Sequence, residues 1–300
     1  MPKFFISLLL FTLVLNSCEI IENNPSIELP DGFCMVFADS VILSHEQIDY
    51  YDYSAHMVYL KNISHIIQDY ESGAEFKVYA DREEIYTGLI HPSYSSTLPM
   101  SPVIHSMPIR YGDYVISIDQ IQVVDTSGIP GTDVRNDARI VQALQKYGQF
   151  HEGLECEIDT IYHTEENNHV TVRLELKNND SYSYYYLDPD KMGEGLFHYF
   201  TNGLVLWDFG EMSFYENQME HIQPDPWDSW EPEWLSLLQS GETRLLTFSY
   251  DSFDVLSSGT YRAYFNFPGL SYQVGFNEVS QENGRIWLGT IHMTTDLVVR

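Results

Sequence analysis

The chain has 300 residues, with 44 acidic against 15 basic side chains and a formal net charge of −29 at pH 7. Such an acidic protein is repelled by nucleic acid and by anionic lipid, so we exclude a nucleic-acid partner and expect any membrane attachment to rely on something other than surface charge. Aromatic residues make up 14% of the sequence, and together with the dispersed aliphatic residues they exclude a disordered chain.

The first eighteen residues have the order of an export signal. Lys3 supplies a positive charge, the segment 4–15 is almost wholly apolar, and Leu15-Asn16-Ser17-Cys18 follows. The apolar run is too short for a permanent membrane span, which predicts a signal peptide over residues 1–17. Its last four residues resemble the lipobox of bacterial lipoproteins, and this resemblance implies that Cys18 becomes the lipidated mature N-terminus. The alternative is an ordinary secretory signal with a coincidental cysteine.

Lipid attachment would then hold the protein at the membrane. Loss of Lys3 leaves 44 acidic against 14 basic residues, a net charge of −30. One acyl chain binds a bilayer only marginally, and bacterial lipoproteins resemble the multiply acylated case. Glu19 follows Cys18, whereas Asp at that position resembles an inner-membrane retention signal, so we expect a cell-envelope protein, at the outer membrane in a host that has one. Residues 18–30 are polar and contain two prolines, which is typical of a tether.

The first folded region, residues 31–152, combines strand and helix patterns. Apolar residues at helical spacing predict helices over 63–70, capped by Ser64, and over 140–147, after a cap at Asp133 or Asn136. The expected strands are 33–38, 56–60, 114–118, 121–124 and a hairpin of 75–79 with 85–90. This mixture predicts an α+β domain.

The second region, residues 153–300, has a nearly pure strand pattern, with helical periodicity only at 234–238. The expected strands are 170–176, 182–187, 204–207, 244–250, 260–267 and 285–292. Six or seven strands over this length predict an all-β sandwich.

Three segments of this region carry a resemblance: 174–178, 238–242 and 258–262. They read Leu-Glu-Leu-Lys-Asn, Leu-Gln-Ser-Gly-Glu and Ser-Gly-Thr-Tyr-Arg. Their order resembles a secreted immunoglobulin-like module, of which the BsuPI-like proteinase-inhibitor domain is one relative. The resemblance covers roughly residues 165–270 and implies an immunoglobulin-like β-sandwich, although the cysteine pair of antibody domains is absent.

A second resemblance lies in the first region. The segments 56–60, 75–79 and 85–90, followed by Pro102-Val103-Ile104, are similar in order to the periplasmic head of SecD. This resemblance implies a fold only, because the chain has none of the later membrane spans of SecD.

Two cysteines remain after Cys18. Cys34 and Cys156 both lie on expected strands. An exported protein reaches a compartment where disulfides persist, so the pair could form a disulfide; alternatively both are buried core residues.

No strong catalytic or metal-binding motif is present. The segment from His45 to Asp49 begins like a zinc-protease helix but has Asp where the second His is needed. The segment 188–193 matches part of a calcium loop, yet Tyr199 stands at its twelfth position. We therefore name no catalytic residue, metal or cofactor and expect a non-enzymatic protein, although catalytic groups can meet in space without a sequence motif.

The segment 224–234 is the strongest candidate for binding. Trp227, Trp230 and Trp234 lie within eight positions among prolines and acids. Exposed indoles bind sugar faces or partner side chains; the alternative is that Trp234 fills the sandwich and the other two pack on its rim. Three functions follow: a cell-envelope binding or accessory module with a protein or glycan partner, a glycan-binding lipoprotein using this loop, or a hydrolase or proteinase inhibitor with an unidentified site.

Overall fold

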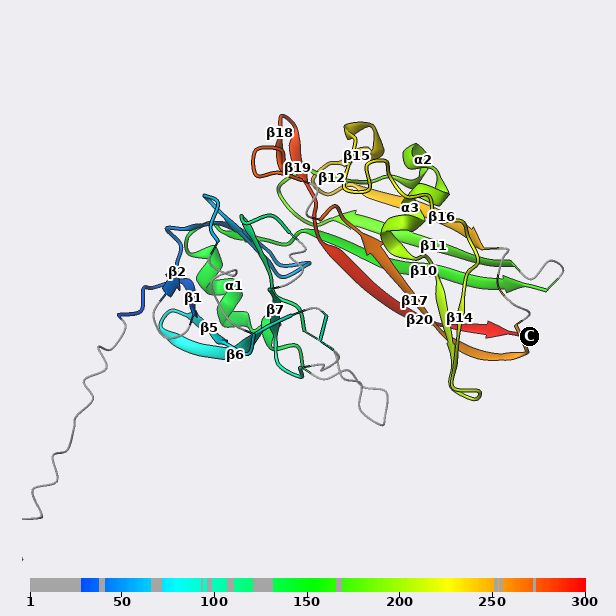
Figure 1. The fold of residues 1–300 in the computed structure, drawn as a ribbon, viewed down its shortest axis with the longest axis horizontal. Coiled ribbons are helices and arrows are strands. Elements are labelled where there is room, and N and C mark those ends of the chain that lie inside the picture. Colours follow the sequence, from blue (N-terminus) through cyan, green and yellow to red (C-terminus); the bar gives the residue numbers. More distant parts are fainter. Residues whose placement is uncertain are drawn as a thin grey trace, which may run out of the picture.

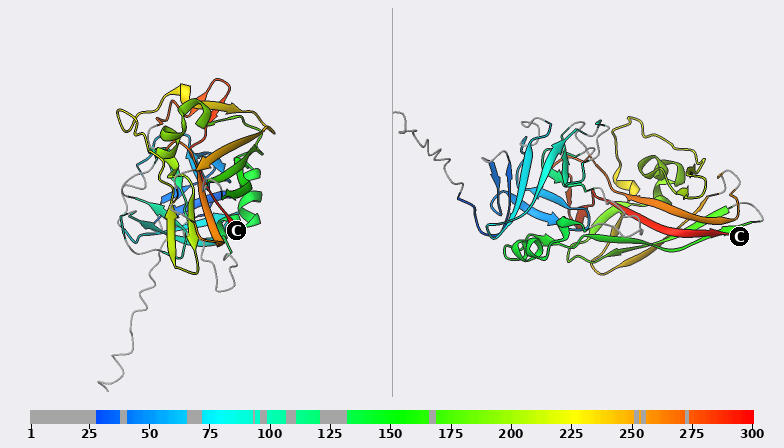
Figure 2. Two further views of the ribbon diagram at one scale, coloured as in Figure 1. Left: turned by 90° about the vertical axis from the view of Figure 1, so that its right-hand side faces the viewer. Right: turned by 90° about the horizontal axis from the view of Figure 1, so that it is seen from below.

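The computed structural model describes residues 28–37, 41–65, 72–92, 94–95, 99–106, 111–120, 132–165, 169–250, 253, 256–271 and 274–300. The predicted signal peptide, Cys18 and the strand expected at 121–124 lie outside these residues. The described chain is elongated, with the first region at one end and the C-terminus at the other (Figure 1). The two regions follow one another along the long axis (Figure 2).

The described residues between 28 and 152 form strands with one α-helix. The strands are β1 (Phe33–Phe37), β2 (Val41–Leu43), β3 (Ile48–Asp52), β4 (Met57–Leu60), β5 (Glu75–Ala80), β6 (Glu83–His91), β7 (Val103–His105), β8 (Val115–Ser117) and β9 (Phe150–His151). They make a five-stranded sheet, β2-β1-β5-β6-β7, and a four-stranded sheet, β8-β4-β3-β9. The predicted hairpin is confirmed as β5 and β6, which pair antiparallel.

The α+β prediction for this region is wrong. Strands account for 47% of the structure and helices for 11%, and the α-helix described here, α1 (Ala138–Gln145), has eight residues. It begins where the Asp137 side chain accepts the Arg139 N–H at 2.9 Å and buries Ile140 and Leu144. At the other expected helix, residues 63–65 are not helical and Ile63 is exposed; the rest of that segment lies outside the described residues.

The second region has eleven described strands. They are β10 (Leu154–Thr164), β11 (His169–Asn178), β12 (Tyr184–Leu187), β13 (Val205–Asp208), β14 (Ser213–Glu216), β15 (Leu235–Leu238), β16 (Thr243–Tyr250), β17 (Gly259–Pro268), β18 (Ser280–Gln281), β19 (Gly284–Ile286) and β20 (Thr290–Val299). They form three sheets, β10-β11-β16, β14-β13-β17-β20 and β15-β12-β19-β18. A third sheet and two helices depart from the immunoglobulin-like layout that the resemblance implied.

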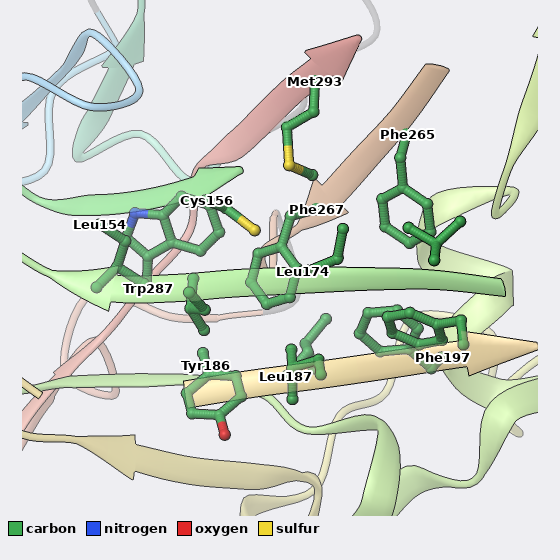
Figure 3. Packing of buried hydrophobic residues seen from close by; sticks show 14 of the residues in the cluster. Leu154, Cys156, Leu174, Tyr186, Leu187, Phe197, Phe265, Phe267, Trp287 and Met293 are labelled. Carbon is green, nitrogen blue, oxygen red and sulfur yellow. The ribbon is translucent and has the colours of Figure 1, made fainter. Parts of the chain in front are cut away.

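Alternating side chains explain why the first two of these sheets pack face to face. On β11, Val172 and Leu174 are buried while Arg173 between them is exposed. On β17, Phe265 and Phe267 are buried while Tyr264 and Asn266 are exposed. Because successive side chains of a strand point to opposite faces, each sheet has one apolar and one outer face. The apolar faces meet in the core shown in Figure 3.

Two helices in this region were not predicted from the sequence. α2 (Pro189–Met192) begins at Asp188, whose side chain accepts the Asp190 N–H, so the segment that matched part of a calcium loop is a helix start. α3 (Glu194–Thr201) follows and buries Phe197 against Phe248 at 5.4 Å between ring centroids. The expected helical periodicity at 234–238 is instead the end of a 3₁₀ turn (Pro232–Trp234) and strand β15.

The two regions share part of one hydrophobic core. Tyr50, Met57 and Tyr59 of the first region belong to the same buried cluster as the sandwich core. The Tyr114 hydroxyl also donates to the Val274 carbonyl at 2.9 Å. A separate cluster fills the first region around Phe33, Phe76 and Leu144. In the described ranges, the helices all fall short of the length and apolarity that crossing a membrane requires.

Candidate functional site: an aromatic sheet face

The outer face of the sheet β14-β13-β17-β20 carries aromatic side chains. Register places Phe214 on β14 opposite Trp207 on β13, and Trp207 opposite Arg262 on β17. Arg262 in turn lies opposite Asp296 on β20. Directly opposed residues of antiparallel strands share a face, so these four side chains form one row across the sheet. The neighbouring Leu206 and Ala263 are buried, which identifies this row as the outward one.

The aromatic end of this row is exposed. The Trp207 and Phe214 rings have centroids 4.2 Å apart at an interplanar angle of 50°, and Phe209 stands at 89° to Trp207 at 6.1 Å. Phe214 is 63% exposed, Phe209 60% and Met212 70%. We call Trp207, Phe209, Met212 and Phe214 the aromatic corner; they lie on the hairpin formed by β13 and β14, and Figure 1 labels β14.

The turn of this hairpin is held by a carboxylate. Asp208 Oδ1 accepts the backbone N–H groups of Gly210 at 2.7 Å and Glu211 at 3.3 Å. A short polar side chain that bonds to the backbone two residues on stabilises a tight turn. These hydrogen bonds therefore hold the turn that carries Phe209 and Met212.

Polar side chains follow the aromatic corner across the same face. Arg262 Nε and Asp296 Oδ1 are 2.9 Å apart. In the next rows, Tyr264 lies opposite Thr294, and Asn266 Oδ1 is 2.7 Å from His292 Nδ1. The face thus changes from apolar at β14 to polar at β17 and β20.

The comparisons with known proteins assign no family. No family profile matches the sequence, and no curated protein matches it. Among solved structures, the chain shows similarity to a β-glucosidase from Listeria innocua in complex with glucose, at 11% identity and a TM-score of 0.20. The match covers 49% of this chain and 16% of that enzyme. A likeness of this extent carries no argument about fold or function.

The three tryptophans expected to bind lie in different environments. Trp227 is 53% exposed. Trp230 is partly buried against the sandwich core, and Trp234 is buried there with Leu235, its ring 6.1 Å from that of Phe200. Trp234 therefore fills the sandwich, as the alternative expected, and a platform of all three indoles does not form.

The structure records Cys34 and Cys156 as free, buried thiols. Cys34 lies on β1 of the first region and Cys156 on β10 of the second. Burial raises the pKa of Cys34 to about 11 and that of Cys156 to about 12. Both thiols are thus protonated at neutral pH, and their burial on strands of different regions agrees with the core role.

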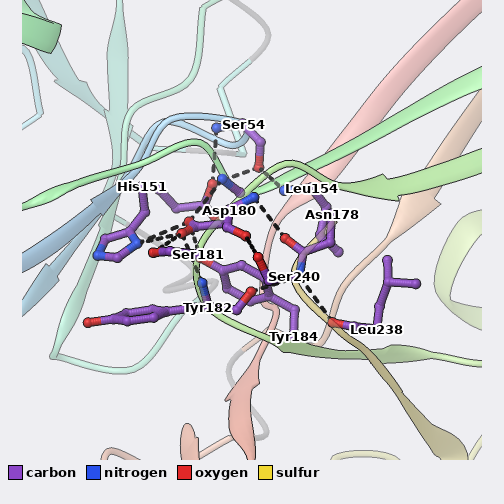
Figure 4. A network of polar contacts seen from close by, with 12 residues as sticks. Ser54, His151, Leu154, Asn178, Asp180, Ser181, Tyr182, Tyr184, Leu238 and Ser240 are labelled. Carbon is purple, nitrogen blue, oxygen red and sulfur yellow. Dashed lines mark hydrogen bonds and ion pairs between the residues drawn. The ribbon is translucent and has the colours of Figure 1, made fainter. Parts of the chain in front are cut away.

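A buried polar network joins the two regions (Figure 4). His151 Nδ1 lies 2.9 Å from Asp180 Oδ1, and Asp180 also accepts the Tyr184 hydroxyl at 2.9 Å and the Gly153 N–H at 3.2 Å. Burial alone would raise the pKa of Asp180, but hydrogen bonds from His151 and from the Tyr182 N–H hold it at about 2. The carboxylate is therefore charged and satisfied, which suits a structural contact.

Beside this network lies Asp52, whose carboxyl group is only partly satisfied. Oδ1 accepts from Ser54 Oγ at 2.6 Å, whereas Oδ2 is buried with no hydrogen-bond partner among the described residues. Burial raises the pKa of Asp52 to about 6, against the opposing hydrogen bonds from Ser54. Together with Tyr50, His151, Gly153, Asp180, Tyr182 and Arg285, Asp52 makes up what we call the junction.

A second buried cluster surrounds His56 in the first region. The Tyr51 hydroxyl is 2.9 Å from His56 Nδ1, and His56 Nε2 is 3.8 Å from Asp133 Oδ2. Arg135 donates to both Asp133 oxygens and to the Ile118 carbonyl. Burial, then the nearby Arg135 charge, lowers the pKa of His56 to about 3, so its ring is neutral at pH 7. Since these groups bond mainly to one another, the cluster supports the β3–β4 turn rather than presenting a reactive group.

The aromatic corner was not predicted from the sequence. A signal was present, because Trp207 and Phe209 stand on either side of Asp208, and Gly210 and Glu211 mark a turn before Phe214. Alternation alone cannot say which side of a strand faces the core. The buried Leu206 decides it, and only the packed sandwich reveals that burial.

Proposed function

We propose that this protein is an exported, lipid-anchored protein of the cell envelope that acts as a non-enzymatic binding or accessory module. Lys3, the apolar segment 4–15 and the lipobox-like end at Cys18 support the anchoring. The exposed aromatic corner supports the binding role, because contiguous exposed apolar side chains commonly mark interaction sites. The partner is an envelope protein or a glycan, and the proposal involves no cofactor.

The aromatic corner is a better candidate than the tryptophan loop. In the loop, Trp230 and Trp234 contribute to the core, and Trp227 alone of the three is mostly exposed. In the corner, three of the four side chains are more than half exposed, and the Phe209 and Phe214 rings both lie beside the Trp207 ring. We therefore place the binding surface on the sheet face rather than at residues 227–234.

Anchoring is tested by replacing the lipidated cysteine. Cys18→Ala removes the thiol to which the lipid is attached, so we expect loss of palmitate labelling and either release from membranes or an uncleaved precursor. Metabolic labelling followed by membrane fractionation measures both results. Unchanged labelling in the variant would disprove the anchor.

Binding is tested by site-specific photo-crosslinking in cells. A photoreactive phenylalanine analogue in place of Phe214 puts the probe in the aromatic corner. The same analogue in place of Thr247 provides the control. Thr247 is exposed and lies opposite Arg173 on the outer face of the other sheet. We expect a crosslinked envelope component from position 214 and none from position 247. Equal crosslinking, or none at either position, contradicts the proposed binding surface.

A further inference from the structure

The outer face combines the two kinds of surface that a sugar needs. A pyranose ring presents C–H groups on its faces, which pack on aromatic rings, and hydroxyl groups at its edge, which both donate and accept hydrogen bonds. Trp207 and Phe214 supply rings at one side of the face. Arg262, Asp296 and Asn266 supply planar polar groups further across the same face, in adjoining rows. A protein partner that contacted this face through apolar side chains alone would not use the polar groups on β17 and β20.

The dimensions of the face suit more than one sugar ring. Four strands separated by about 4.8 Å give a face roughly 14 Å wide from β14 to β20. Tyr264 and Asn266 continue the face along β17 beyond the row of Trp207. A chain of several sugars can therefore contact aromatic and polar groups at the same time.

Charge favours a neutral ligand. The net charge of −29 repels polyanions, and Arg262 is neutralised by Asp296 at 2.9 Å. A second copy of the chain fits poorly, because it would bring the acidic rim, Asp208, Glu211 and Glu216, against further acidic surface. The hairpin tip is also poorly suited to insertion into lipid, because insertion would remove water from the carboxylates of Asp208 and Glu211.

We propose that the outer face of β14-β13-β17-β20 binds a neutral polysaccharide, with Trp207 and Phe214 against a sugar ring and with Arg262, Asp296 and Asn266 bonding to hydroxyl groups. This inference rests on the proposed function, because it identifies the ligand of the same surface.

The test measures binding of defined oligosaccharides to the full chain in detergent by isothermal titration calorimetry. The probes are the hexasaccharides of cellulose, xylan, mannan, amylose and chitin, with an oligogalacturonate as the anionic control. We expect saturable binding of at least one neutral probe and none of the anionic one. Trp207→Ala should weaken binding by about tenfold or more, since central aromatic contacts carry much of the binding energy.

Two further variants keep the result interpretable. Phe214→Ser changes an exposed edge-strand residue and should weaken binding without altering the fold, so it covers the case in which Trp207→Ala unfolds. Asn266→Ala should weaken binding because it removes an amide that bonds to sugar hydroxyl groups. Trp227→Ala, in the loop that does not contribute to this face, is the matched control and should leave the affinity unchanged.

Three results would overturn the inference. Binding that survives both Trp207→Ala and Phe214→Ser places the sugar elsewhere, and binding lost in Trp227→Ala places it at the loop. Absence of binding to all five neutral probes rejects the polysaccharide. If no neutral probe binds, crosslinking of an envelope protein from position 214 would still support the binding module, with a protein as its partner. If no crosslink forms either, both the polysaccharide inference and the proposed binding surface are rejected.

Discussion

The junction and the outer face are built from similar residue types, but they use them differently. At the junction, the Arg285 guanidinium lies 4.2 Å from the centre of the Tyr50 ring and 5.0 Å from that of Tyr182, and it pairs with Asp49 at 3.0 Å. On the outer face, Arg262 lies opposite Trp207 in register and pairs with Asp296.

The difference lies in what covers the aromatic rings. Tyr50 is 2% exposed because strands of both regions enclose it, and it stacks on Tyr59 at 4.1 Å. Phe214 is 63% exposed on the edge strand of its sheet. An arginine stacked on a buried ring such as Tyr50 stabilises the fold, whereas exposed rings such as Phe214 are available to a partner. Variants at the two places should therefore separate stability from binding.

The largest effect is expected from Tyr50→Ala. Removing a fully buried aromatic ring leaves a cavity and should lower the free energy of unfolding by about 3–5 kcal/mol. Urea unfolding followed by circular dichroism measures this change. The matched variant Tyr264→Ala, on the outer face, should cost clearly less than Tyr50→Ala, because Tyr264 is 37% exposed whereas Tyr50 is 2% exposed. Similar losses for the two variants would mean that the outer face is also part of the stabilising core.

A smaller, pH-dependent effect is expected from Asp52→Asn at the junction. The pKa of Asp52 is raised to about 6 in the folded protein. Above that pH the ionised carboxylate therefore lowers the free energy of unfolding. The penalty fades as pH falls from about 6 to 4. Asp52→Asn should therefore stabilise the protein by about 2–3 kcal/mol at pH 7.5 and by almost nothing at pH 4. Unfolding of both proteins at pH 4, 5.5 and 7.5 measures the difference.

Asp180→Asn is the control, because its expected effect on the free energy of unfolding has the opposite sign. Its pKa is held at about 2, so the ionised carboxylate stabilises the folded protein above about pH 4, and this contribution is lost as pH falls through 2. The variant should be destabilised at pH 7.5 by about 2 kcal/mol, with a shrinking difference at lower pH. If both variants change stability in the same direction at pH 7.5, the assignment of the two carboxyl groups is wrong.

The smallest effect on stability is expected at the aromatic corner. Phe214→Ser replaces an exposed ring, so the free energy of unfolding should change by less than about 0.5 kcal/mol. Retention of the full chain on a phenyl column should fall, because the exposed apolar surface shrinks. A fall in stability comparable to that of Tyr50→Ala would show that Phe214 is needed for the sheet and not left open for a partner.

Local signals in the sequence predicted the parts of the fold that depend on local chemistry. The 75–79 and 85–90 hairpin and the helix before Gly148 were found because turn residues and caps act over a few positions. The helix start at Asp188-Pro189 carries an equally local signal, but there it resembles part of a calcium loop. The α+β prediction was wrong because apolar spacing alone does not show whether a segment has a face to bury; Ile63, at the start of the other expected helix, is exposed and not helical.

The candidate site depended on contacts that the sequence does not display. Trp207, Arg262 and Asp296 are separated by dozens of positions, and strand register brings them into one row. The tryptophan cluster at 227–234 was more conspicuous in the sequence, yet tertiary packing took Trp234 into the core. Register and burial, rather than composition, decide which aromatic residues remain available.

Gly153, at the start of the second region, has a consequence for how the two regions are joined. Its φ is +74°, and a Cβ there would lie 2.3 Å from Asp52 Oδ1 and 2.4 Å from Ser54 Oγ. Both neighbours belong to the first region, so a methyl group at this position would act as a wedge between the two halves. The close packing of the two regions at this point therefore requires glycine, and any larger residue would push Asp52 and Ser54 away from the start of β10.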